Sequence, residues 1–270
     1  MVGFGVVYRV GSRNEVPGHT GATHILEHLM FKGSERFNRA SGTEAARELH
    51  RVGASFNATT WLDRTNYFEV LPVEQLSLAV DIESDRMRGA LVRDSDLESE
   101  RTVVLNELDA GENDSFDLLM KSSFALAYLE HPYRHPTIGW RNDVERMSGE
   151  VLRGFYDTYY YPDNATVIVV GDVDEATALD EVERGFGVLG QAPGPIPELA
   201  IREPEQRVQP FRDPGPAGVD AHHEGRGYAA RLEQPSKLVG HVTDSGLDLR
   251  GVTPGTGVGG LGVMHRKGAH

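Results

Sequence analysis

The pattern of hydrophobic and polar positions predicts strands and helices over the first 190 residues of the chain. Val6, Tyr8 and Val10 lie two positions apart, so they share one face of an extended segment. Segments of this extended kind, which we predict to be strands, are residues 3–11, 55–61, 65–71 and 165–171. Segments with apolar residues three or four apart, which we predict to be helices, are residues 20–32, 43–52, 73–88, 95–112, 116–129, 148–161 and 175–186.

This order of elements predicts an α+β fold. The short connection at residues 62–64 predicts a hairpin between the second and third strands. Strands and helices otherwise alternate irregularly, which favours a mostly antiparallel sheet covered by helices on one face. On the helix at 95–112 we expect Val103, Val104 and Leu108 to form the buried side.

The pattern fails in the last part of the chain. Gly and Pro supply 19 of the 70 residues at 201–270, and sustained periodicity is absent there. We therefore expect one domain at 1–200, whose first strand is missing if the fold begins before Met1, and an irregular Gly/Pro-rich tail at 201–270.

Composition narrows the class of protein. The 270 residues are 39% hydrophobic and 25% charged, which fits a soluble globular protein with a core. The net charge of -14 argues against nucleic acid and anionic membranes as partners. The sequence has no cysteine, no signal peptide and no apolar run of about 18 residues that would span a membrane. The compartment stays undefined, with the cytoplasm as the default.

The most informative stretch is residues 24–28. His24 and His28 lie four residues apart, so their imidazoles share one face of the predicted helix, and Glu27 lies on the same side. Two such imidazoles can bind zinc, and the carboxylate between them can act as a general base. The spacing therefore predicts a zinc site for amide hydrolysis.

A catalytic zinc site needs a third protein ligand and an open position for water. Glu98, Glu100 and Glu107 lie on the helix predicted at 95–112, and the last two share one face because they are seven residues apart. One of this pair could bind the metal, while the other could hold an imidazole through its second nitrogen. An acidic run of this kind is also usual on a solvated helix face. We consider the remaining candidate histidines, His131, His135, His222 and His223, weak ligands.

At this point the sequence resembles a known family. About residues 6 to 190 are similar to the N-terminal catalytic half of the M16 metallopeptidases, the pitrilysin and mitochondrial processing peptidase family. The stretches that carry the resemblance are 11–15 (GSRNE), 24–28 (HILEH), 31–34 (FKGS), 53–59 (GASFNAT), 63–67 (DRTNY), 100–107 (ERTVVLNE), 131–133 (HPY), 161–165 (YPDNA) and 171–173 (GDV).

The resemblance implies roles for the residues that match the family's motifs. It implies that His24, His28 and Glu107 bind Zn²⁺, because Glu107 follows His28 by 79 residues, close to the family's spacing. It implies that Glu27 is the catalytic base, and it places Glu100 at a second acidic position that supports catalysis. The resemblance also implies that residues Asn57, Ala58 and Thr59 belong to an edge strand that pairs with an extended peptide substrate.

The resemblance implies a zinc-dependent metalloendopeptidase that cuts extended peptides. Members carry a second, metal-free half, in the same chain or in a homo- or heterodimeric partner, and that half is absent here. A non-catalytic alternative therefore stays open, in which the chain binds zinc and peptide and needs a partner half for activity. The similarity ends near residue 206, so the residues beyond it are either a native tail or the product of a shifted reading frame.

Overall fold

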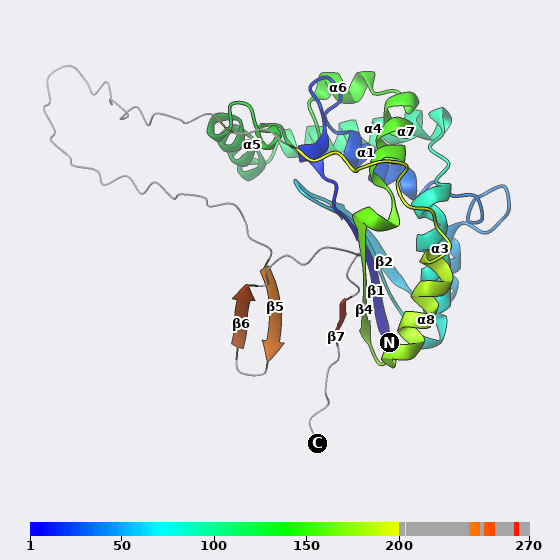
Figure 1. Ribbon diagram of the computed structural model, residues 1–270. Coiled ribbons are helices and arrows are strands. Elements are labelled where there is room, and N and C mark those ends of the chain that lie inside the picture. Colours follow the sequence, from blue (N-terminus) through cyan, green and yellow to red (C-terminus); the bar gives the residue numbers. More distant parts are fainter. Residues whose placement is uncertain (200–202, 204–237, 244–245, 252–261, 265–270) are drawn as a thin grey trace, which may run out of the picture. The chain divides into compact units, whose positions relative to one another are not determined.

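Four antiparallel strands form the sheet on which the fold is built, as shown in a computed structural model of the chain (Figure 1). These strands are β1 (Val2–Tyr8), β2 (Ser55–Thr60), β3 (Thr65–Leu71) and β4 (Ala165–Gly171). A short strand, β7 (Gly262–Met264), pairs parallel with β4, so that the order across the sheet is β2-β3-β1-β4-β7. β2 therefore lies at one edge of the sheet, and β1 lies at its centre.

Alternation along β1 explains why this segment is a central strand. Val2, Phe4, Val6 and Tyr8 are buried on one face, whereas the residues between them are half-buried on the other. Val6 is paired on both sides, with Tyr67 of β3 and Val167 of β4. The period of two thus sets both the register of the sheet and the face that meets the core.

Eight helices and four short 3₁₀ turns accompany the sheet in the described residues. The helices are α1 (Ala22–Met30), α2 (Ala45–Arg51), α3 (Leu76–Gly89), α4 (Asp94–Glu112), α5 (Ser115–Ala127), α6 (Arg141–Arg146), α7 (Gly149–Tyr159) and α8 (Glu175–Phe186). The 3₁₀ turns are η1 (Ser12–Asn14), η2 (Val73–Gln75), η3 (Pro132–Arg134) and η4 (Pro162–Asn164). Figure 1 shows α3 and α8 side by side along one face of the sheet. The predicted α+β class, with helices on one face, is confirmed.

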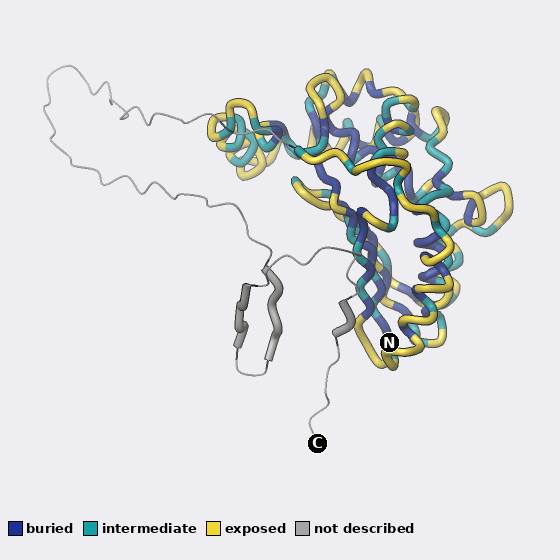
Figure 2. The backbone as a smooth tube through the Cα atoms, in the orientation of Figure 1, coloured by how far each residue is buried: buried dark blue, intermediate teal, exposed yellow. Residues whose placement is uncertain are grey.

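The core lies between the sheet and the helices. Helix α1 contributes Ile25, Leu26 and Leu29 to it, and α7 contributes Leu152 and Tyr156; all five side chains are almost fully buried. Figure 2 shows that the buried backbone follows the central strands and the helices next to them, while α5 is largely exposed. Helix α1 is thus held in the interior, which fixes the position of every side chain it carries.

Three local predictions were wrong. Val103 is 40% exposed, whereas Val104 and Leu108 are buried, because only residues three or four apart can share the buried side of α4. The helix expected at 73–88 is divided into η2 and α3. Helix α6 was not predicted, because its six residues, five of them polar or charged, show no hydrophobic period.

The structure describes residues 1–199, 203, 238–243, 246–251 and 262–264. The chain divides into one unit of Met1–Pro204 with Gly259–His270 and a second unit of Glu205–Val258. In the second unit, β5 (Leu238–Thr243) and β6 (Gly246–Gly251) form an antiparallel pair, although no regular structure was predicted there. Most of the expected irregular tail lies outside the described residues, and the boundary near residue 200 stays a prediction. Within the described part, helices are too short or too polar to cross a membrane.

Candidate metal centre

The start of helix α1 is fixed by a close approach of two backbone segments. Gly21 has a φ of 87° and precedes the helix, and Gly139 has a φ of 88°. A Cβ on Gly21 would lie 2.6 Å from the carbonyl oxygen of Ile138, and one on Gly139 would lie 2.5 Å from that of Thr20. Both positions require glycine, because the conformation is left-handed and the space for a side chain is absent.

Two carboxylates from outside the helix satisfy its first backbone amides. The buried Glu15 accepts hydrogen bonds of 2.8 Å from the N–H groups of Gly21 and Thr23. Asp143 accepts a hydrogen bond of 3.2 Å from the N–H of Thr20 and one of 2.7 Å from its hydroxyl. Negative charge at this end also suits the helix dipole. The rest of α1 is therefore anchored from its N-terminal side.

The structure brings His24, His28 and Glu107 together between α1 and α4. The Nε2 atoms of both imidazoles lie 3.7 Å from Oε2 of Glu107, and the three candidate ligand atoms lie within 4.8 Å of one another. The two rings are 4.8 Å apart between centroids and nearly perpendicular. Two residues of one helix and one residue of a neighbouring helix thus converge on a single point.

This donor set fits zinc. Ligand atoms about 2.1 Å from a tetrahedral zinc ion would lie about 3.4 Å apart, close to the separations found here. Zinc requires neutral imidazoles, and burial, with a smaller effect of the nearby His28, lowers the pKa of His24 to about 4. Three protein ligands leave a fourth position for water or substrate, which is the pattern of catalytic rather than structural zinc sites.

Glu100 contacts the same cluster from behind His28. Its Oε2 lies 2.9 Å from Nδ1 of His28, and its Oε1 lies 2.5 Å from Nζ of Lys32. Burial raises the pKa of the Glu100 carboxyl, but the hydrogen bonds from Lys32 and His28 outweigh burial and lower it. The second nitrogen of His24, by contrast, has no hydrogen-bond partner among the described residues. The two imidazoles are therefore supported unequally.

Glu27 lies next to His28 on α1 and is positioned separately from the ligands. One of its carboxylate oxygens, Oε2, accepts a hydrogen bond from the hydroxyl of Thr60 at the end of β2. Burial raises the pKa of the Glu27 carboxyl, although the Thr60 hydrogen bond and His28 oppose this rise. A half-buried carboxylate with a raised pKa is suited to take up and release a proton.

The predicted substrate strand lies next to this site. Residues Asn57, Ala58 and Thr59 belong to β2, which pairs only with β3 among the described strands. The Asn57 side chain accepts a hydrogen bond of 2.8 Å from the N–H of Ala58, and the Thr59 hydroxyl donates to Asn66 at 2.7 Å. The outer edge of β2 thus offers backbone groups that an extended peptide can pair with.

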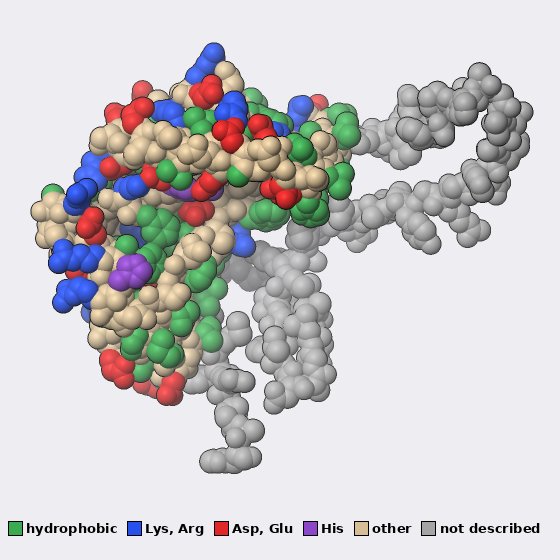
Figure 3. Space-filling model, turned by 180° about the vertical axis from the view of Figure 1, so that it is seen from behind, with side chains coloured by type: hydrophobic (Ala, Val, Ile, Leu, Met, Phe, Trp, Pro, Cys, Tyr) green, Lys and Arg blue, Asp and Glu red, His purple; other side chains and the backbone are tan. Residues whose placement is uncertain are grey.

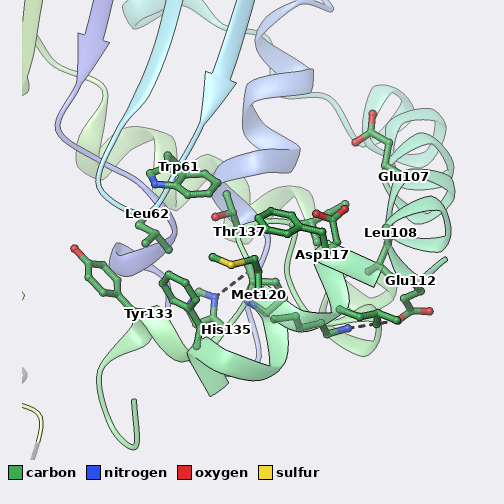
Figure 4. A pocket seen from close by; sticks show the side chains of 17 residues that line it. Trp61, Leu62, Glu107, Leu108, Glu112, Asp117, Met120, Tyr133, His135 and Thr137 are labelled. Atoms are coloured by element: carbon green, nitrogen blue, oxygen red, sulfur yellow. Dashed lines mark hydrogen bonds and ion pairs between the residues drawn. The ribbon is translucent and has the colours of Figure 1, made fainter. Parts of the chain in front are cut away.

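A cavity of about 360 Å³ lies beside Glu107 (Figure 4). Its wall is mainly apolar, with Trp61 and Leu62 after β2 on one side and Met120 of α5 on the other. Figure 3 shows hydrophobic side chains gathered at the end of the molecule where α5 lies, and Phe116 there is 66% exposed. An apolar side chain would fit this cavity within reach of the candidate metal ligands.

Sequence reasoning missed Lys32, Thr60 and the cavity. Lys32 carried a signal, because it follows His28 by four residues, as His28 follows His24. Thr60 carried none, since its partner is distant in sequence. Of the weak candidates, His135 lies 3.7 Å from Glu15, outside the metal cluster. His222 and His223 lie outside the described residues.

Two family models match the chain. Residues 1–138 match the model described as "Insulinase (Peptidase family M16)". Residues 146–229 match the model described as "Peptidase M16 inactive domain". The first match contains the whole candidate metal centre, together with Glu27, Thr60 and β2.

The chain is also similar to proteins named as zinc proteases. It is 30% identical over 207 residues to an uncharacterised zinc protease of Streptomyces coelicolor, covering 76% of this chain and 44% of the relative. It is 32% identical over 203 residues to the zinc protease PqqE of Helicobacter pylori, covering 74% and 45%. A crystal structure of a protease from Helicobacter pylori matches with a TM-score of 0.72 and 31% identity, over 76% of this chain and 49% of that one. The chain thus spans less than half the length of these curated relatives.

Proposed function

The chain belongs to peptidase family M16, the insulinase family, and we propose on that basis that it is a zinc-dependent endopeptidase of extended peptides. Zinc is its cofactor. The observation that carries the proposal is the convergence of His24, His28 and Glu107 on one point, with Glu27 beside them. We propose that these three residues hold the metal and that Glu27 is the general base.

The division of roles follows from the positions of the side chains. Zinc in such a site acts as a Lewis acid that polarises a carbonyl and lowers the pKa of water in the site to about 7. Glu27 accepts the proton of the attacking water through the oxygen that Thr60 leaves free, and then donates this proton to the leaving amine. Glu100 holds the ring of His28 through Nδ1 and so orients its Nε2.

The substrate class follows from β2 and the cavity. We propose that a peptide pairs with the outer edge of β2 through main-chain hydrogen bonds, which make few demands on its sequence. The apolar cavity beside Glu107 supports a preference for an apolar side chain near the scissile bond. The substrates of this proposal are therefore unfolded or flexible polypeptides with an apolar residue at the cut.

The proposal is tested with quenched fluorescent peptides that differ only in the residue at the cut, Leu or Phe against Asp. We expect Glu27→Gln to lower hydrolysis at least about 100-fold while zinc stays bound, because only proton transfer is lost. His28→Ala should lose the zinc. Glu98→Gln, an exposed acidic residue of the neighbouring helix, is the matched control. Hydrolysis by Glu27→Gln at the native rate would refute the mechanism.

The length of the chain favours a second candidate function. Because the chain spans less than half of its curated relatives, it is in this alternative a half that binds zinc and peptide and needs a second M16-like half for turnover. The same assay separates the two candidates. Peptide binding without hydrolysis by the chain alone, and hydrolysis after addition of a second half, would support the alternative.

A further inference from the structure

Lys32 lies at the end of a ladder of alternating groups between α1 and α4. His24, His28 and Lys32 are spaced four residues apart along α1 and just beyond its end, and Glu107 and Glu100 are spaced seven apart on α4. Glu107 lies 3.7 Å from both imidazoles, and Glu100 lies 2.9 Å from His28 and 2.5 Å from Lys32. The last rung is the only one without a proposed metal ligand.

We propose that Lys32 is a positioning residue of the metal centre, which fixes the carboxylate of Glu100 so that it presents His28 to zinc. This inference rests on the proposed metal site and adds to it a residue that touches neither the metal ligands nor the substrate strand. Lys32 acts through one carboxylate.

The geometry gives Lys32 a specific task. The Glu100 side chain is only 8% exposed, so few water molecules can hold it, and its two oxygens need protein partners. Lys32 binds Oε1, and this leaves Oε2 directed at Nδ1 of His28. Without the ammonium, the carboxylate can rotate about its last bond, and the imidazole loses its fixed orientation.

A simple charge effect would have the opposite sign. An ammonium near a bound dication repels it, so the removal of Lys32 by itself should strengthen zinc binding. Loss of a positioning group should weaken zinc binding instead, typically about 10-fold to 100-fold for partners of a metal ligand. The direction of the change therefore distinguishes positioning from bulk electrostatics.

The experiment measures zinc affinity of the full chain by competition with a chromogenic chelator at fixed pH. We expect Lys32→Met to weaken zinc binding about 10-fold and Lys32→Arg to stay within about two-fold of native. In a Glu100→Gln background, Lys32→Met should have no further effect, because Lys32 acts through Glu100. Arg51→Met removes a comparable exposed cation from α2, where Arg51 pairs with Glu48, and should leave the affinity unchanged.

Each result decides the inference. Unchanged or tighter zinc binding by Lys32→Met would overturn it, as would an equal effect of Lys32→Met with and without Glu100. A native protein that binds no zinc, or binds it equally well as His28→Ala, would overturn the proposed metal centre as well. Thermal unfolding of each variant, with Lys32→Gln as a second substitution, separates loss of affinity from loss of fold.

Discussion

One carboxylate oxygen of Glu27 accepts a hydrogen bond from Thr60, and the proposed mechanism uses the other for proton transfer. Thr60 is the last residue of β2, whose outer edge we propose as the peptide site. The general base and the substrate strand are thereby connected through one hydroxyl. The orientation of the base thus depends on the position of the strand.

This connection gives a prediction for Thr60. Thr60→Val keeps the branched shape but removes the donor, so we expect kcat for peptide hydrolysis to fall about 10-fold with KM nearly unchanged. Thr60→Ser should retain most of the activity. The same change in β4, Thr166→Val, serves as the control for loss of a strand hydroxyl. Equal losses for Val and Ser at position 60 would contradict this role for the hydroxyl.

A second prediction concerns Glu15, which anchors the start of α1. Burial raises the pKa of its carboxyl to about 8, although hydrogen bonds from the N–H groups of Thr23 and Gly21 oppose this rise. A group with a raised pKa in the folded state contributes stability below its ordinary pKa near 4.5, and this contribution is lost as the pH rises through about 8. The free energy of unfolding should therefore decline across this window.

Urea unfolding at pH 5 and pH 8 measures this decline. We expect Glu15→Gln to be less stable than native at pH 5, because its amide can accept only one of the two N–H bonds. The difference between the variant and the native chain should narrow at pH 8, since Gln carries no buried charge. The exposed Glu98→Gln is the control. A difference independent of pH would show that Glu15 is ionised throughout.

The residues of the site differ in how well the sequence predicts them. His24, Glu27 and His28 follow from spacing within one helix, which is a local property. The family resemblance, rather than the spacing, singled out Glu107 from three acidic residues on α4. The contact of Thr60 with Glu27 depends on how β2 packs against α1, and local pattern carries no information on such packing.

At the scale of elements, the strands were predicted best. The bounds of β3 and β4 agree with their hydrophobic patterns, because alternation and flanking turns both mark their ends. Helix α6 and the division between η2 and α3 were missed, since a six-residue helix and a single 3₁₀ turn are too short to show a period. Val103 was misassigned because two adjacent valines cannot both face one partner.

The edge strand β2 allows a test that leaves the protein unchanged. If a peptide pairs with β2, every second of its amides points at the strand. Methylation of those amides should weaken binding to Glu27→Gln about five-fold per lost hydrogen bond, whereas methylation of the intervening amides should have less effect. Fluorescence anisotropy of labelled peptides measures both series. Equal effects along the peptide would argue against pairing with β2.

For the molecule as a whole, zinc should connect α1 to α4. Binding to the folded chain adds about 2.7 kcal/mol when free zinc is 100 times its Kd, which corresponds to a midpoint of unfolding about 5–10 °C higher in a chain of this size. A chelator should remove this gain and added zinc should restore it. In His28→Ala the midpoint should not respond to either. A native midpoint independent of zinc would contradict the proposed site.

The open edge of β2 also bears on what chooses a substrate. Main-chain pairing reads no side chains, so a polypeptide qualifies only if several of its residues can be released from their own structure. For a folded protein, that release requires local or global unfolding, and its free energy adds to the barrier for cleavage. Selection then lies in the substrate's conformational stability: two proteins with the same cleavable segment would be cut in proportion to how often each exposes it.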